Sequence, residues 1–117
     1  MTNSFIEISV QELAKKLQSD ATFTILDVRE AWELEYARLD NPRVLHIPMS
    51  VLATNRQQAF PEELRHPQAE IIVMCHHGMR SASVAAWMVN NGWKNISSLA
   101  GGIDAYAAEI DPGAGSY

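Results

Sequence analysis

The fold of this chain is decided by residues 70–81, EIIVMCHHGMRS. Residues 71–74 form an unbroken apolar run rich in β-branched side chains, which is typical of a strand buried on both faces of a parallel sheet. After a short loop, residues 80–91 are predicted to form a helix that is apolar nearly all round, with Gly92 as its C-terminal stop. A buried strand that leads through a loop into a buried helix indicates an α/β domain.

Strands and helices alternate along the rest of the chain. Ser9 and Glu12 form a capping-box pattern at the start of a helix with one apolar stripe. The other predicted strands cover residues 5–8, 23–26, 44–48 and 95–99, short helical turns fall within 49–66, and a last helix covers 103–109. This pattern predicts one domain, 1–117, around a mostly parallel sheet, with its core at about 5–108 and a loose tail at 109–117.

Length and composition limit the classes of function. The chain has 117 residues, 47% of them apolar and 20% charged, and a formal net charge of −5. These values fit one soluble globular domain, and the acidity argues against binding to nucleic acid or to an anionic membrane surface. No signal peptide and no apolar run of membrane-spanning length are visible. The single cysteine excludes an internal disulfide and favours a reducing, cytoplasmic location.

Several chemistry-bearing residues follow predicted strands. Asp27, His46 and Cys75 stand at or next to carboxyl ends of strands, which a parallel sheet brings to one edge. Cys75 enters a tight loop before a helix, where backbone N–H groups and the helix dipole favour an anion. Gly78 permits a positive φ, and Arg80 adds a permanent positive charge. The loop therefore predicts a reactive thiolate at Cys75.

The loop CHHGMRS at 75–81 resembles the active-site loop of the rhodanese family through its cysteine, glycine, arginine and serine. Three further stretches resemble that family's landmarks in the same order: LDVRE at 26–30, HIP at 46–48 and LAGGI at 99–103. The resemblance covers residues 7–106 and departs from the family at Tyr106, where tryptophan is usual. It implies an α/β fold of the rhodanese type, a five-stranded, mostly parallel sheet flanked by helices on both faces.

The resemblance also implies a sulfurtransferase. Cys75 would take a sulfane sulfur from thiosulfate or a persulfide donor, hold it as a persulfide, and pass it to cyanide, a thiol or a protein acceptor. The rest of the loop is expected to bind the substrate and cradle the persulfide: His76, His77, Gly78, Met79, Arg80 and Ser81. No cofactor is expected. Because Cys75 is the only cysteine, turnover requires an external acceptor.

Other interpretations of Cys75 stay open. Phosphatases and arsenate reductases also combine a cysteine, an amide cradle and an arginine, but their loops are typically longer than the four residues between Cys75 and Arg80. A sulfur-carrier module for a protein partner would use the same persulfide. A binding module without catalysis and a buried structural cysteine are further alternatives. A metal site at Cys75, His76 and His77 is not expected, because no carboxylate or second cysteine is evident nearby.

Asp27 and Arg29 are secondary candidates at the same edge of the sheet. The local pattern predicts that Asp27 caps a helix and that Arg29 pairs with Glu33 one turn later. Arg29 is also a candidate for attracting an anionic donor. Of His76 and His77, at most one is expected to face the sulfur, because adjacent side chains on a tight loop diverge.

Overall fold

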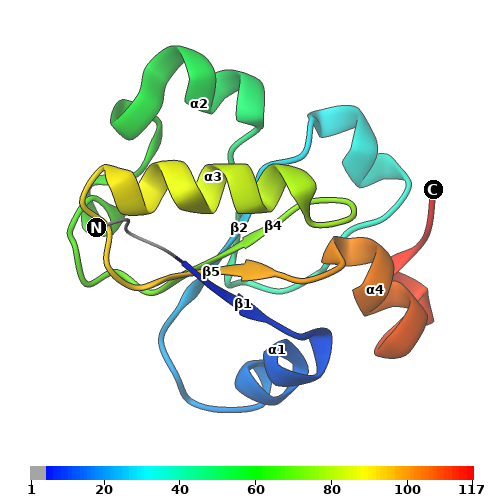
Figure 1. Cartoon of the computed structure of the whole chain (residues 1–117). Helices are drawn as coiled ribbons and strands as arrows, with labels where there is room; N and C mark the ends of the chain where they lie inside the picture. Colours follow the sequence, from blue (N-terminus) through cyan, green and yellow to red (C-terminus); the bar gives the residue numbers. More distant parts are fainter. Residues whose placement is uncertain (1–4) are drawn as a thin grey trace.

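A single parallel sheet organises the computed structural model, which describes residues 5–117 and leaves residues 1–4 outside its description. The strands are β1 (Ile6–Ile8), β2 (Thr24–Asp27), β3 (Val44–His46), β4 (Ile71–Met74) and β5 (Ile96–Leu99). Their order across the sheet is β1-β5-β4-β2-β3, and every pair is parallel (Figure 1). The predicted parallel sheet of five strands is confirmed, with β4 at its centre.

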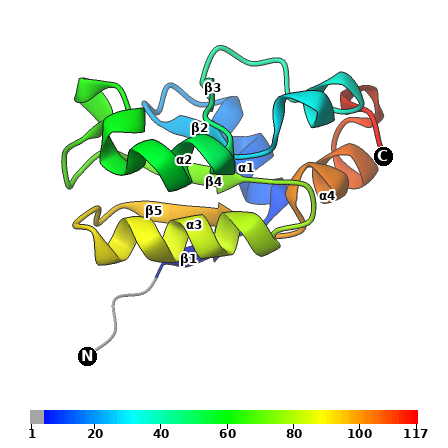
Figure 2. The ribbon, with the colours of Figure 1, turned by 90° about the horizontal axis from the view of Figure 1, so that it is seen from above.

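Helices cover both faces of this sheet. The α-helices are α1 (Val10–Leu17), α2 (Met49–Asn55), α3 (Met79–Asn90) and α4 (Gly102–Glu109). Four short 3₁₀ helices complete the described chain: η1 (Ala31–Glu35), η2 (Arg56–Ala59), η3 (Glu62–Leu64) and η4 (Pro112–Ala114). Helices α2 and α3 lie on one face, and α1 and α4 lie on the other (Figures 1 and 2).

Strand β4 divides the hydrophobic core into two layers. Ile71 and Val73 pack toward α2 and α3, whereas Ile72 and Met74 pack toward α1 and α4. All four side chains are fully buried. Since helices cover both faces of this central strand, none of its positions faces water, which explains the unbroken apolar run. The carboxyl end of β4 then delivers Cys75 to the edge of the sheet where α3 and α4 begin (Figure 2).

The C-terminal segment, for which the sequence predicts a loosely held tail, packs against the residues that follow η1. The Arg38 N–H donates to the Ala114 carbonyl at 2.8 Å, and Gly115 forms an antiparallel bridge with Ala37. A Cβ at Gly115 would collide with the Tyr36 carbonyl, so this approach requires glycine. The small residues that suggest a loose tail therefore allow close packing.

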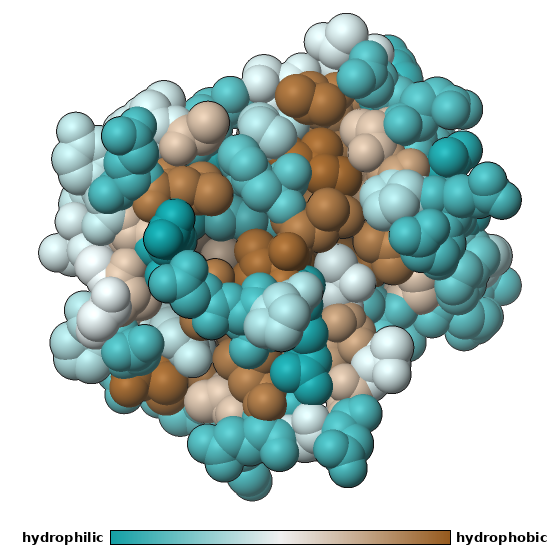
Figure 3. All heavy atoms as spheres, turned by 180° about the vertical axis from the view of Figure 1, so that it is seen from behind, coloured by the Kyte–Doolittle hydropathy of each residue, from teal (hydrophilic) through white to brown (hydrophobic). Residues whose placement is uncertain are grey.

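Apolar side chains also reach the surface. The large exposed ones are Ile6, Trp32, Tyr36, Val51 and Met79. Figure 3 shows the face opposite to that of Figure 1, on which apolar groups surface in broken patches among polar ones. No helix within residues 5–117 is long and apolar enough to cross a membrane.

Candidate active site

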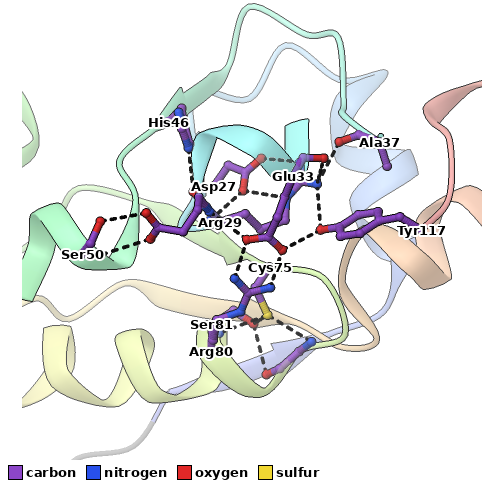
Figure 4. A network of polar contacts seen from close by, with 12 residues as sticks. Asp27, Arg29, Glu33, Ala37, His46, Ser50, Cys75, Arg80, Ser81 and Tyr117 are labelled. Atoms are coloured by element: carbon purple, nitrogen blue, oxygen red, sulfur yellow. Dashed lines mark hydrogen bonds and ion pairs between the residues drawn. The ribbon is translucent and has the colours of Figure 1, made fainter. Parts of the chain in front are cut away.

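Backbone amides converge on the sulfur of Cys75. Its Sγ accepts hydrogen bonds from the Gly78 N–H at 3.1 Å and the Ser81 N–H at 3.3 Å, and it lies 3.5 Å from Ser81 Oγ (Figure 4). The side chain is 1% exposed. Both amides belong to the segment that opens α3, so the loop and the helix dipole place partial positive charge around the sulfur. An anionic sulfur fits this setting better than a neutral one.

Two glycines let the loop fold tightly. Gly78, with φ of 109°, is the N-cap of α3, and a Cβ there would lie 3.2 Å from the Gly101 amide nitrogen. Gly102, with φ of 60°, packs so close to the loop that a Cβ would overlap the carbonyls of Cys75 and His76. The first turn of α4 supports those carbonyls, because the Ile103 N–H donates to Cys75 O at 2.9 Å. The loop is thus held from α3 on one side and from α4 on the other.

Arg80 is bound to a carboxylate that the sequence does not associate with it. Its two terminal nitrogens donate to the Glu33 carboxylate at 2.7 and 2.8 Å, in a bidentate ion pair between α3 and η1. The hydrogen bonds from Arg80 are the largest cause that lowers the pKa of Glu33, to about 2, and the same bonds raise the pKa of Arg80. Glu33 is 3% exposed, so its charge is compensated inside the protein. The predicted ion pair between Arg29 and Glu33 is wrong, because Glu33 pairs with Arg80.

Arg29 pairs instead with Asp27, and both side chains are buried. Arg29 Nε and Nη2 donate to the two Asp27 carboxylate oxygens at 3.0 and 2.8 Å, and Nη1 donates to the Ala37 carbonyl at 2.8 Å. Arg29 is 0% exposed, which leaves no face for an anionic donor. Asp27 does not cap the following helix either, because Glu30 and Glu33 form the capping box of η1. This pair stabilises the turn after β2.

The two histidines of the loop differ in their surroundings. The His76 ring is sandwiched between His77, with centroids 3.8 Å apart, and Tyr117, with centroids 3.7 Å apart and planes at 4°. Burial is the largest cause that lowers the pKa of His76, and His77 adds to it. His77 is exposed, with Nε2 3.9 Å from a carboxylate oxygen of Asp104. In the described chain, neither imidazole makes a hydrogen bond to Cys75.

Asp104 corrects the expectation that no carboxylate lies near these histidines. Ligand atoms of His76, His77 and Asp104 lie within 4.8 Å of one another. Zinc–nitrogen bonds of about 2.0–2.1 Å require nitrogen lone pairs that converge on one point. The two imidazoles stack, so their lone pairs run side by side rather than together. A ring would have to rotate before this group held a transition metal.

Some of the predicted loop residues contact the sulfur of Cys75 and others do not. Gly78 and Ser81 bond the sulfur through their amides, whereas Arg80 bonds Glu33. The Met79 side chain is 83% exposed and points away from the core. The sequence does not indicate that Glu33 is the partner of Arg80, nor that Tyr117 and Ser98 belong to the site. Their contacts join positions far apart in the chain, and only the Glu33 capping box leaves a local signal in the sequence.

Tyr117 connects the polar groups on the far side of Glu33. Its hydroxyl donates to Glu33 Oε1 at 2.8 Å and accepts from Arg29 Nη1 at 3.1 Å (Figure 4). Its ring stacks on Tyr36 and meets the edge of Trp32. The exposed rings of Trp32 and Tyr36 thus continue outward from the stack on His76. This aromatic group forms one border of the loop that carries Cys75.

Comparison with known proteins gives a consistent set of relatives. The family model described as "Rhodanese-like domain" matches residues 9–109. The chain is 33% identical over 115 residues to rhodanese-like/PpiC domain-containing protein 12 of Arabidopsis thaliana, and 33% identical over 109 residues to the putative sulfur carrier protein YrkF of Bacillus subtilis. It covers only 37% and 55% of the lengths of these two relatives. It is 32% identical to thiosulfate sulfurtransferase GlpE of Haemophilus influenzae, covering 88% of this chain and 89% of that protein.

Solved structures agree on the fold. A rhodanese-like domain protein from Staphylococcus aureus is 26% identical, with a TM-score of 0.73, and the match covers 91% of this chain and 95% of that one. A rhodanese-related protein from Thermoplasma volcanium, also 26% identical, has a TM-score of 0.72 and coverage of 91% and 94%. The similarity therefore extends over nearly the whole described domain.

Proposed function

The chain belongs to the rhodanese-like domain family, and from that premise we propose that it is a sulfurtransferase that carries sulfane sulfur as a persulfide on Cys75. The observation that supports this most directly is the pair of amides from Gly78 and Ser81 on Cys75 Sγ. Such donors stabilise a negative sulfur without needing a metal or a second thiol. The single cysteine leaves the reductive step to an external acceptor.

The proposed reaction has two displacements at sulfur. The Cys75 thiolate attacks the outer sulfur of thiosulfate, a new S–S bond forms, and the old S–S bond breaks as sulfite leaves with its electron pair. The product is a persulfide anion, and the loop amides are placed to stabilise it. An acceptor then attacks the outer sulfur and takes it from Cys75. Cyanide becomes thiocyanate in this step, and a thiolate acceptor becomes a persulfide. Cys75 returns as a thiolate, which makes the kinetics ping-pong.

For Arg80 we propose an anchoring role in place of direct contact with the donor. Each terminal nitrogen of its guanidinium donates one hydrogen bond to Glu33, whose negative charge cancels much of the field that Arg80 would offer to an anion. The pair ties the first turn of α3 to η1 and so holds the amides in place around Cys75. Arg80→Ala is then expected to slow sulfur transfer from anionic and from neutral donors to a similar degree. A loss confined to anionic donors would favour direct recognition of charge by Arg80.

A sulfur-carrier module is the second candidate function. It is favoured by the Bacillus subtilis relative, which is named a putative sulfur carrier, and by the exposed Trp32 and Tyr36 beside the loop, which suit contact with another protein. The two functions share the persulfide and differ only in the acceptor. The proposal in both forms keeps a reducing, cytoplasmic location, because the Cys75 thiol must return to its reduced state.

Steady-state transfer from thiosulfate to cyanide tests the enzymatic form. Thiocyanate should appear with parallel double-reciprocal lines, as expected of a ping-pong reaction, and Cys75→Ser should abolish it. Ser83→Ala, an exposed change on α3 outside the loop, is the matched control and should leave the rate unchanged. Thiocyanate release that survives in Cys75→Ser would rule out Cys75 as the carrier. Hydrolysis of an aryl phosphate without thiocyanate release would favour phosphatase chemistry instead.

A further inference from the structure

Two buried hydroxyls lie behind the sulfur of Cys75. Ser98 Oγ is 2.9 Å from Ser81 Oγ, which is 3.5 Å from Cys75 Sγ. Ser81 and Ser98 are both 0% exposed. They come from different elements, Ser81 from the first turn of α3 and Ser98 from β5. A continuous chain of polar atoms therefore runs from β5 to the sulfur.

The partners of these hydroxyls decide which one donates. Among residues 5–117, Ser81 Oγ is the only partner of the Ser98 hydroxyl, whereas Ser81 Oγ also lies 3.2 Å from the Gly78 carbonyl oxygen. A buried hydroxyl proton without an acceptor is costly. The Ser98 O–H therefore donates to Ser81 Oγ. Ser81 keeps its own proton for the Gly78 carbonyl or for Cys75 Sγ.

We propose that Ser98 is a positioning residue that stabilises the anionic sulfur of Cys75 through Ser81. In the thiol form, the Cys75 S–H donates to Ser81 Oγ and the Ser81 O–H donates to the Gly78 carbonyl. When the thiol releases its proton to solvent, the Ser81 O–H turns to Sγ. The Ser98 O–H then polarises that donor from behind, which strengthens its bond to the sulfur. The inference rests on the proposed function, in which the anionic sulfur attacks the donor.

Several charged side chains surround the sulfur of Cys75, and Ser98→Ala leaves all of them in place. The titratable and charged side chains that lie closest to the loop are Asp27 and Arg29 beside the end of β2, Glu33 on η1, His76 and His77 on the loop, Arg80 on α3, Asp104 on α4 and Tyr117 in the C-terminal segment. Glu35 on η1 and Tyr106 and Glu109 on α4 belong to the same elements. Replacing the Ser98 hydroxyl by hydrogen changes none of these charges. A shift in the ionisation of Cys75 after that change therefore reports the hydroxyl itself.

The test follows alkylation of Cys75 by iodoacetamide as a function of pH. Because the chain has one cysteine, intact mass reports this thiol alone. Ser98→Ala is expected to move the midpoint of the rate profile upward by about 0.5 pH unit, a roughly threefold loss of thiolate below the midpoint. Ser97→Ala, a neighbouring change on β5 outside the relay, should leave the midpoint unchanged. An unchanged midpoint in a folded Ser98→Ala protein overturns the proposal.

A double-mutant cycle separates a relay from a packing defect. Ser81→Ala should shift the midpoint by more than Ser98→Ala does, and adding Ser98→Ala to Ser81→Ala should cause no further shift, because Ser98 acts only through Ser81. Additive shifts would contradict the relay. If circular dichroism shows that Ser98→Ala does not fold, Ser81→Ala alone decides the relay: its midpoint should rise, and an unchanged midpoint would contradict it. Alkylation needs no sulfur donor, so failure of thiosulfate transfer leaves this result standing.

Discussion

Glu33 is the residue that joins the separate polar groups of the site. Its carboxylate accepts two hydrogen bonds from Arg80 and one from Tyr117, all between 2.7 and 2.8 Å. Arg80 lies in the first turn of α3, which follows the Cys75 loop, and Tyr117 covers His76 on the same loop. Protonation of the Glu33 carboxylate would therefore weaken two attachments of the loop, the one to η1 and the one to the C-terminal segment.

Acid is expected to destabilise the protein through Glu33. Its pKa lies at about 2 in the folded chain, below the ordinary 4.5, so its contribution is fully present above the ordinary pKa and is lost as the pH falls toward 2. Glu33→Gln should reduce the free energy of unfolding near neutral pH by about 1–2 kcal/mol, because Arg80 is partly exposed to solvent. The same variant should flatten the acid-induced loss.

Urea unfolding at a series of pH values measures both effects of Glu33→Gln. Glu63→Gln is the matched control, since Glu63 is exposed on η3. Its acid sensitivity should equal that of the unchanged protein. If Glu33→Gln also kept the full acid sensitivity, Glu33 would not be the group responsible.

The Tyr117 ring covers one face of the His76 imidazole, whose burial is the largest cause of its lowered pKa. Removing the ring with Tyr117→Ala uncovers one face of the imidazole, so the pKa of His76 is expected to rise toward its ordinary 6.5. Titration of the His76 ring protons by NMR measures the change. Tyr36→Ala removes a ring that stacks on Tyr117 and not on His76, and serves as the control. If the pKa of His76 rose more in Tyr36→Ala than in Tyr117→Ala, the Tyr117 ring would not be the group that buries this imidazole.

Among the elements, the turn into α4 supports the cysteine loop most closely. Gly102 has no room for a Cβ beside the carbonyls of Cys75 and His76, and its φ is positive. Gly102→Ala is therefore expected to reduce stability by about 2–4 kcal/mol and to displace the loop. Gly92→Ala is the matched comparison, because Gly92 also has a positive φ but nothing within 4 Å of its would-be Cβ. Gly92→Ala should cost about 1 kcal/mol, from backbone strain alone.

Thermal unfolding and the alkylation rate of Cys75 measure this comparison. Gly102→Ala should change both quantities, whereas Gly92→Ala should lower stability and leave the alkylation rate as it was. Equal effects of the two variants on Cys75 would show that α4 does not set the geometry of the loop.

The sequence predicted strands and helices well where burial of a segment produces a recognisable pattern of apolar residues. The apolar run before Cys75 became β4, and the helix predicted at 80–91 is α3, displaced by one residue. The amide cradle also followed from local order, since a glycine loop before a helix directs N–H groups inward. These features depend on neighbours in the chain. Contacts between distant segments depend on the packed fold, and the sequence carries no local pattern for them.

For the whole molecule, the distant contacts of the site involve η1, α3, β5 and the C-terminal segment. Arg80 and Glu33 are 47 positions apart, and Tyr117 and Glu33 are 84 apart. The charge pattern around Arg29 allowed a pair with Glu33 one turn away, yet the fold places Asp27 closer to Arg29 and gives Glu33 to Arg80. Only tertiary packing chooses between two partners of the same charge.

The C-terminal segment is expected to contribute to global stability. Deleting residues 112–117 removes the backbone bond from Arg38 to Ala114, both hydrogen bonds of the Tyr117 hydroxyl and the stack on His76. A loss of about 2–3 kcal/mol in the free energy of unfolding follows from these contacts. Urea unfolding compares the deletion with Ser116→Ala, an exposed change in the same segment. Unchanged stability after the deletion would indicate the loosely held tail that the sequence predicts.

Intact mass after incubation with thiosulfate tests the central claim, that Cys75 carries sulfur, most directly. The reduced protein is expected to gain the mass of one sulfur atom, to lose it on addition of cyanide or dithiothreitol, and to gain nothing when Cys75 is replaced by serine. A folded protein that stays at its original mass, or a Cys75→Ser protein that takes up the same sulfur, would contradict the claim.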